Sequence, residues 1–173
     1  GELPDIEAVL SQFPKNALLC VRPSSEDADW GGPSAVLNIG MNDALYTDMC
    51  DQLGTDAATT IYTRFVQSYS VHVARLDPDM FDDVVGDGRE GLTETLHAYE
   101  SETDEKFPSD LGTQLAAVLR SMARAWDGTS ARLLRQAQGA PADAGLGLVV
   151  QQMAFGVGKA HSGSGVLQHQ TPF

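Results

Sequence analysis

The stretch Leu18-Leu19-Cys20-Val21-Arg22-Pro23-Ser24-Ser25-Glu26-Asp27, followed by Val36-Leu37-Asn38-Ile39-Gly40-Met41-Asn42-Asp43, decides the fold. Its first apolar run predicts a strand over residues 17–21, and its second predicts another over residues 35–39. The two strands are antiparallel if the residues between them form a hairpin. The first strand brings Arg22 to a polar turn, where a guanidinium group is suited to bind phosphate or carboxylate oxygens. The alternative is a surface arginine paired with Glu26 or Asp27.

The middle of the chain is predicted to be helical. A short helix over residues 4–12 precedes the first strand, and Asn42-Asp43 caps a helix that Gly54 ends. The clearest helix starts at Thr55, and a second long helix is expected over residues 109–126. Their apolar stripes are Ile61, Phe65, Tyr69, Val73 and Leu76 in the first, and Leu111, Leu115, Val118, Leu119, Met122 and Trp126 in the second.

A third helix of this middle part is expected to begin at Thr129 and to end near residues 139–141. Residues 86–91 are rich in glycine and charge, and a short helix is expected just before them, from Pro78. The acidic residues 100–106 are expected to be a solvated loop or a helix end.

Two further strands are predicted near the end of the chain, over residues 146–155 and 165–168, joined by a loop. Strands at both ends with helices between them predict the α+β class. We expect one domain over residues 1–173, with two small antiparallel sheet pieces around a helical lobe at about 43–140.

Charge and composition exclude several classes of function. The 173 residues carry 24 acidic and 11 basic side chains, a net charge of −13. This charge opposes nucleic-acid binding, which needs clustered lysine and arginine. No apolar run approaches the ~20 residues of a membrane-spanning helix, so no membrane partner is expected. The two cysteines are interpreted as buried small residues without a disulfide, no signal peptide is recognised at the N-terminus, and the cytoplasm is the expected compartment.

Several motifs resemble those of the pyruvate phosphate dikinases, which are related to the phosphoenolpyruvate synthases. The opening stretch resembles V-R-S-G-x-x-x-x-x-G-x-x-x-T-x-L-N-L-G-L-N-D, and residues 61–69 resemble the helix Y-R-R-F-x-x-x-Y. Residues 125–131 correspond to S-W-D-N-P-R-A, residues 150–156 to V-Q-x-M-V-F-G, and residues 161–166 to T-S-G-T-G-V. The motifs keep the family's order over about residues 17–172, so the resemblance is specific.

The resemblance implies a nucleotide site within an ATP-grasp domain. Arg22 and Arg64 occupy positions whose arginines contact ATP phosphates in the family, and two guanidinium groups there would offset triphosphate charge. Residues Gln151, Gln152, Met153 and Ala154 lie at the family's adenine hinge, although a plain strand with Met153 in the core explains them equally. Residues Ser162, Gly163 and Ser164 resemble an anion-binding loop, for which a generic hairpin turn is the alternative.

The resemblance also implies ATP and Mg²⁺ as cofactors and other domains of a larger enzyme as possible partners. The family's phosphorylated histidine motif, its ATP-binding lysine and its metal-binding carboxylates do not occur in these residues. His161 lies in a different motif, and no histidine or cysteine spacing predicts a zinc site. No catalytic residue and no metal ligand is therefore assigned to the chain.

The chain departs from the family pattern at several other positions. Pro23 replaces the serine after the phosphate arginine and removes a backbone donor. Glu26 stands at a position that is often basic, and Ser34 at the position of an aspartate. The sequence therefore predicts the nucleotide-binding region of a phosphotransferase that is inactive alone. The alternative is a degenerate, non-catalytic scaffold or interaction module derived from that domain.

Overall fold

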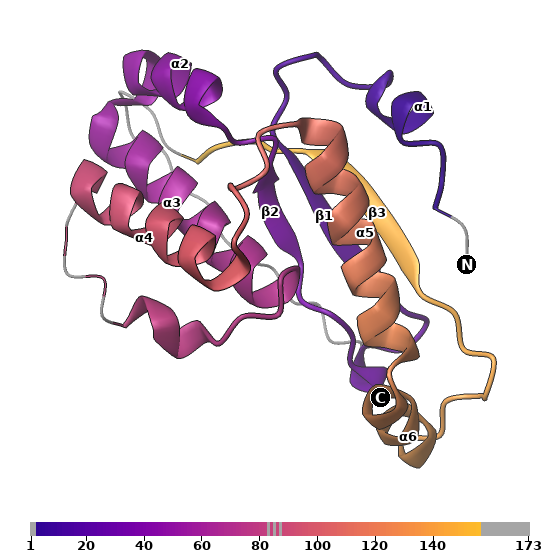
Figure 1. The fold of residues 1–173 in the computed structure, drawn as a ribbon. Coiled ribbons are helices and arrows are strands. Elements are labelled where there is room, and N and C mark those ends of the chain that lie inside the picture. The colour runs from indigo at the N-terminus through magenta and orange to yellow at the C-terminus, as the bar shows by residue number, and fades with distance from the viewer. Residues whose placement is uncertain (1–2, 83, 85, 87, 157–173) are drawn as a thin grey trace.

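The computed structural model describes residues 3–82, 84, 86 and 88–156 of the chain (Figure 1). The described part contains six α-helices, two short 3-10 helices and three strands, which confirms the predicted α+β class. The elements in order are α1 (Ile6–Leu10), β1 (Leu19–Ser24), η1 (Ala28–Trp30), β2 (Val36–Ile39), α2 (Asp43–Leu53), α3 (Thr55–His72), η2 (Pro78–Phe81), α4 (Gly88–Thr103), α5 (Leu111–Asp127), α6 (Thr129–Ala137) and β3 (Gly147–Gln152).

The three strands form one antiparallel sheet in the order β2-β1-β3. In β1, Leu19 is opposite Ile39 of β2 and also opposite Gln152 of β3. The strands from the two ends of the sequence therefore share one sheet, whereas two separate sheet pieces were expected. The pattern of each strand predicts the strand itself, but pairing between distant strands depends on packing that no local pattern encodes.

Local capping signals place several helix starts. The side chain of Asp5 accepts a hydrogen bond from the backbone N–H of Ala8, and Asn42 does the same for Leu45. Asp110 accepts from the backbone N–H of Thr113 at 2.7 Å. A side-chain oxygen at this position satisfies one of the four N–H groups that a helix start leaves without a partner.

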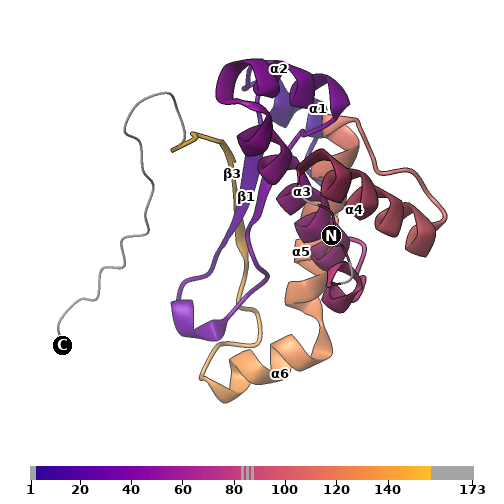
Figure 2. The ribbon, with the colours of Figure 1, turned by 90° about the vertical axis from the view of Figure 1, so that its left-hand side faces the viewer.

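The core lies between one face of the sheet and the layer formed by α2 to α5 (Figures 1 and 2). Leu19 and Val21 of β1 are fully buried in this core, with Phe65 on α3 and Val118 on α5. Successive strand residues point to opposite faces, so alternate residues of β1 face the helices. The opposite face of the strands carries none of the described helices α2 to α5 (Figure 2).

Helix α4 is the main feature that the sequence reading missed. It spans Gly88–Thr103, where a glycine-rich segment and a solvated acidic segment were expected. Its buried residues Leu92, Thr95 and Tyr99 follow a spacing of three and four, and Tyr99 packs edge-on against Phe107 with ring centroids 5.1 Å apart. The helical period was present, but the polar composition of the segment hid it.

No helix in the described ranges combines the length and apolar character that crossing a membrane requires.

Candidate functional site

The helix-free face of the sheet carries the first of the predicted site residues. Leu19 and Val21 point into the core, so Cys20, Arg22 and Ser24 point to the opposite face. Arg22 and Ser24 are exposed, whereas Cys20 is only 3% exposed. The strand thus presents one charged and one hydroxyl side chain in a row, with a cysteine before them.

Strand β3 adds a second predicted residue to the same face. In the register of the two strands, Cys20 is opposite Gln151 and Arg22 is opposite Val149. Directly opposite residues of an antiparallel pair point to the same side of a sheet, and diagonal neighbours come within reach of long side chains. The structure therefore places Arg22 and Gln151 at diagonal positions on one face, although 129 positions separate them in the sequence. Val149, which is 46% exposed, lies directly opposite Arg22 on the same face.

Of the other residues predicted for the adenine edge, Gln152 does not share this face. Gln152 is opposite Leu19, whose side chain faces the core, so Gln152 lies on the helix side of the edge strand. Met153 packs against the core, and its backbone N–H donates to Leu18 O at 2.8 Å. This packing favours the alternative interpretation of Met153 as a core residue. Ala154 is exposed and follows the strand.

Arg64 lies elsewhere. It is exposed on α3, and it lines an open pocket of about 290 Å³ together with Thr60, Thr63 and Gln67 of the same helix. Because α3 packs on the helix-covered face and Arg22 points to the other face, the structure does not bring these two arginines together. The convergence expected from the resemblance is absent among the described residues.

The remaining predicted residues, Ser162, Gly163 and Ser164, lie outside the described residues, as do His161 and the strand predicted over residues 165–168.

A second pocket lies at the C-terminal end of β1, beyond Arg22. This open pocket has a volume of about 550 Å³, and Ser24, Glu26 and Gly31 are among its lining residues. The pocket continues the row of polar side chains on β1, because Ser24 shares the face of Arg22. The carboxylate of Glu26 adds negative charge at its rim and opposes an anion there.

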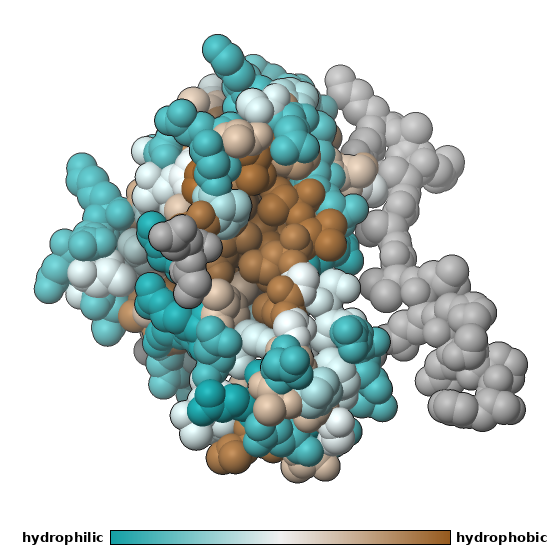
Figure 3. Space-filling model, turned by 90° about the vertical axis from the view of Figure 1, so that its right-hand side faces the viewer, coloured by the Kyte–Doolittle hydropathy of each residue, from teal (hydrophilic) through white to brown (hydrophobic). Residues whose placement is uncertain are grey.

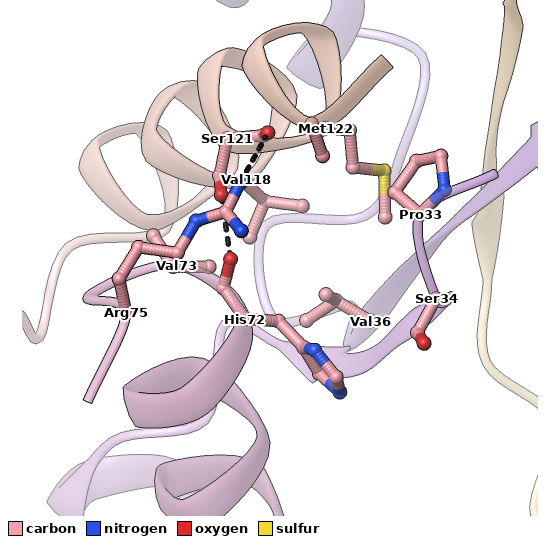
Figure 4. Close-up of a pocket in the computed structure, with 10 residues that line it drawn as sticks. Pro33, Ser34, Val36, His72, Val73, Arg75, Val118, Ser121 and Met122 are labelled. Atoms are coloured by element: carbon pink, nitrogen blue, oxygen red, sulfur yellow. Dashed lines mark hydrogen bonds between the residues drawn. The ribbon is translucent and has the colours of Figure 1, made fainter. Parts of the chain in front are cut away.

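A smaller pocket lies between the end of α3, α5 and β2, and its volume is about 70 Å³ (Figure 4). Ser121 Oγ donates to the carbonyl of His72 at 2.5 Å, and Arg75 Nη2 approaches the carbonyl of Ser121 at 3.4 Å. Ser34, which stands at the position of a family aspartate, also lines it. None of the predicted nucleotide residues lines this pocket, and the hydrogen bonds that cross it tie α3 to α5.

The described residues contain no group of three or more histidine, cysteine, aspartate or glutamate side chains that could hold a metal ion. The basic group on the helix-free face of β1 is the guanidinium of Arg22. The chemistry available on this face is therefore attraction of an anion, together with polar contacts from Ser24 and Gln151.

Sequence reasoning missed part of this arrangement. Val149 and Ser24 share the face of Arg22 but were not singled out. The signal for Ser24 was present, since it lies two residues after Arg22 in a strand. Val149 could be placed only once the pairing of β1 with β3 was known.

The sequence of the chain is similar to those of several known proteins. No family model matches the chain. The pyruvate, phosphate dikinase of Clostridium symbiosum is 28% identical over 174 residues, which cover 90% of this chain and 20% of the relative. That of Rhizobium meliloti is 30% identical over 177 residues, with 90% and 19% covered. The chloroplastic enzyme of Flaveria trinervia is 25% identical over 185 residues, with 97% and 19% covered.

The resemblance to pyruvate, phosphate dikinases is confirmed. It extends over nearly the whole chain, and the chain spans about a fifth of the length of these relatives. The pyruvate, phosphate dikinase resemblance thus covers β1 and β3, which together carry Arg22 and Gln151.

Proposed function

We propose that this chain is part of the ATP-binding region of a phosphotransferase similar to pyruvate, phosphate dikinase. Nucleotide would bind on the helix-free face of the β2-β1-β3 sheet, in an ATP-grasp arrangement. The observation that carries the proposal is the placement of Arg22 and Gln151 on that one face, at diagonal positions of the β1–β3 pair.

The phosphates would lie at Arg22. A guanidinium group donates two parallel hydrogen bonds to phosphate oxygens, and such charge-assisted bonds contribute roughly 1.5–3 kcal/mol each. Ser24 lies two residues further along the same face and supplies a hydroxyl donor toward the pocket of about 550 Å³. In a chain of net charge −13, a cation at the site is needed to attract a polyphosphate.

The base would lie toward Gln151. Its amide offers both donor and acceptor groups, which match the polar edge of a purine. The exposed side chain of Val149, opposite Arg22, supplies an apolar contact between the two polar positions. Apolar walls with a few placed polar groups are typical of small-molecule sites.

The proposal includes Mg²⁺ only as the ion that is bound to the nucleotide. A bound Mg²⁺ would supply positive charge that offsets the charge of the phosphates. Because the described residues hold no cluster of metal ligands, the proposal assigns them none. It also assigns no phosphoryl transfer to these 173 residues alone, since the histidine and pyruvate-binding parts of the reaction are not among their motifs.

The second candidate is a non-catalytic scaffold that keeps the fold for interaction. Three observations favour it. Arg64 lies away from Arg22, so one of the two expected phosphate contacts is lost, and Glu26 lines the pocket beyond Arg22. Pro23 also removes a backbone donor next to Arg22.

Titration calorimetry with Mg-ATP separates the two candidates. With one arginine and no lysine at the site, we expect a dissociation constant no better than about 1 mM, near −4 kcal/mol. Arg22→Ala should abolish this binding, and Arg120→Ala, which removes an exposed arginine from α5, should not. Higher salt should weaken binding by screening. No heat at about 10 mM nucleotide, or equal binding by Arg22→Ala, would support the scaffold.

A further inference from the structure

An open apolar groove lies between η2 and α4 on the helical layer. Its volume is about 410 Å³. It is lined by the half-buried apolar residues Met80, Val84 and Ala98 and by the exposed polar residues Thr93, Glu94 and His97. Figure 2 shows α4 on the side of the molecule away from the helix-free face of the sheet, so this α4 groove is separate from the proposed nucleotide face.

The segment that builds the α4 groove is the most acidic part of the chain. Residues 77–105 carry 11 of the 24 acidic side chains and one arginine, a local charge of −10 within the total of −13. Glu94 lines the groove, and Glu90 precedes it by one turn of α4, where residues four apart share a face. The one arginine, Arg89, is engaged with α2, since its guanidinium lies over the ring of Tyr46 at 5.7 Å from the centroid. The α4 groove therefore attracts a positively charged partner.

A second apolar area of the surface differs in charge. Figure 3 views the side of the molecule on which Figure 1 shows α5 and β3, and a hydrophobic area occupies its centre. Residues 106–156, which include α5, α6 and β3, carry five basic and three acidic side chains. Nearly balanced charge there selects no partner chemistry, whereas the charge around the α4 groove selects one.

The walls of the α4 groove decide how a partner can bind. They are mostly helical, so their backbone groups are bonded within the helices and offer no strand edge for another strand. Recognition then depends on side chains, as when an amphipathic helix places its apolar face in a groove. An inorganic cation alone would leave Met80, Val84 and Ala98 uncovered, and the described residues hold no group of metal ligands.

We propose that the α4 groove binds a basic amphipathic helix of a partner polypeptide. The apolar side chains of that helix would cover Met80, Val84 and Ala98, and its lysine or arginine side chains would lie against Glu90 and Glu94. Burial of the apolar surface supplies affinity, and charge complementarity supplies specificity and rapid association. Because the α4 groove is separate from the sheet face, this binding does not depend on nucleotide.

Fluorescence anisotropy of the full chain with a labelled peptide tests the proposal. The probe is a leucine–lysine peptide whose leucines recur at i, i+3, i+4 and i+7. The control peptide has the same composition in an order that spreads the leucines around the helix. The amphipathic peptide should bind roughly tenfold more tightly or better, a difference of about 1.4 kcal/mol. Equal affinities would show attraction by charge alone and would overturn the proposal.

Ala98→Gln places a longer polar side chain in the α4 groove. It should weaken binding of the amphipathic peptide roughly tenfold and leave the control peptide unaffected. Ala123→Gln, at an exposed position of α5, is the matched variant and should bind like the wild-type chain. Unchanged affinity in a folded Ala98→Gln chain would contradict the proposal. Self-association of the wild-type chain that Ala98→Gln abolishes would assign the groove to a second copy instead.

Glu94→Gln tests the charge of the same groove without filling it. Glutamine can still accept the hydrogen bond that Glu94 Oε2 receives from the N–H of Gly86 at 3.2 Å. Affinity for the amphipathic peptide should fall severalfold at low salt, and the difference should shrink at high salt by screening. Glu7→Gln removes the same charge from an exposed position of α1 and should leave the affinity unchanged. Equal losses in both variants would show that only net charge matters and that no docking surface exists at α4.

Discussion

Gln114 should be one of the most sensitive polar positions in this protein. Its side chain is fully buried at the start of α5. Its Oε1 accepts from the N–H of Gly40 at 2.6 Å, and its Nε2 donates to the carbonyls of Met41 at 3.1 Å and Pro108 at 2.6 Å. One side chain thus holds the end of β2 and the segment before α5 together.

Gln114→Met keeps the size of the side chain but leaves these three backbone groups without their partner. Gly40 and Met41 are buried, whereas Pro108 is half-buried and can be reached by water. Each buried orphan group costs about 1–3 kcal/mol, so the free energy of unfolding should fall by about 3 kcal/mol, allowing for the apolar gain of methionine.

Urea unfolding followed by circular dichroism measures this loss. Gln136→Met, at an exposed position of α6, is the matched control and should change the free energy of unfolding by less than about 0.5 kcal/mol. A loss below about 1 kcal/mol in Gln114→Met, with an unchanged denaturant slope, would show that the three bonds do not stabilise the fold as argued.

Four other substitutions test the core, a helix cap and the site. Phe65→Ala and Trp126→Ala remove aromatic rings that are 1% and 5% exposed, and each should cost about 3–5 kcal/mol; an unchanged melting temperature in both would refute the packing. Asp110→Ala should cost about 1 kcal/mol at pH 7. The backbone N–H of Thr113 lowers the pKa of Asp110 in the folded chain. The stabilisation is therefore present above the unfolded pKa of about 3.9 and is lost as the pH falls through the lower folded pKa. Urea titrations should show that the difference in unfolding free energy between the wild-type chain and Asp110→Ala shrinks in acid. Arg64→Ala should leave the affinity for Mg-ATP within about twofold, since Arg64 lies away from Arg22; a tenfold loss would return Arg64 to the site.

Much of the fold follows from local signals in the sequence. Asn42 and Gly54 bound α2 as predicted, because a side-chain cap and a residue at positive φ are local requirements. The apolar stripe of α3 was placed in part, since α3 ends at His72 and the predicted members Val73 and Leu76 follow it. Phe65 and Tyr69 are buried as expected, but Ile61 is only half-buried and Tyr62 is buried in its place.

The long-range features could not be obtained in this way. The pairing of β1 with β3 joins segments that lie more than a hundred residues apart, and the motifs gave no register for it. The sequence therefore proposed Arg22 and Gln151 separately, and only the register shows that they share a face. It also proposed Arg64 for the same site, because a family motif carries no information about which side of the sheet a helix covers.

The most direct test of the proposed nucleotide face is an NMR titration of the full chain with Mg-ATP, in which the backbone amide shifts are mapped onto the structure. If nucleotide binds this face, the largest shifts should cluster at Arg22, Ser24, Val149 and Gln151, and Arg22→Ala should remove them. Shifts centred on Thr60, Thr63 and Arg64 of α3, or none at about 10 mM nucleotide, would contradict nucleotide binding on this face.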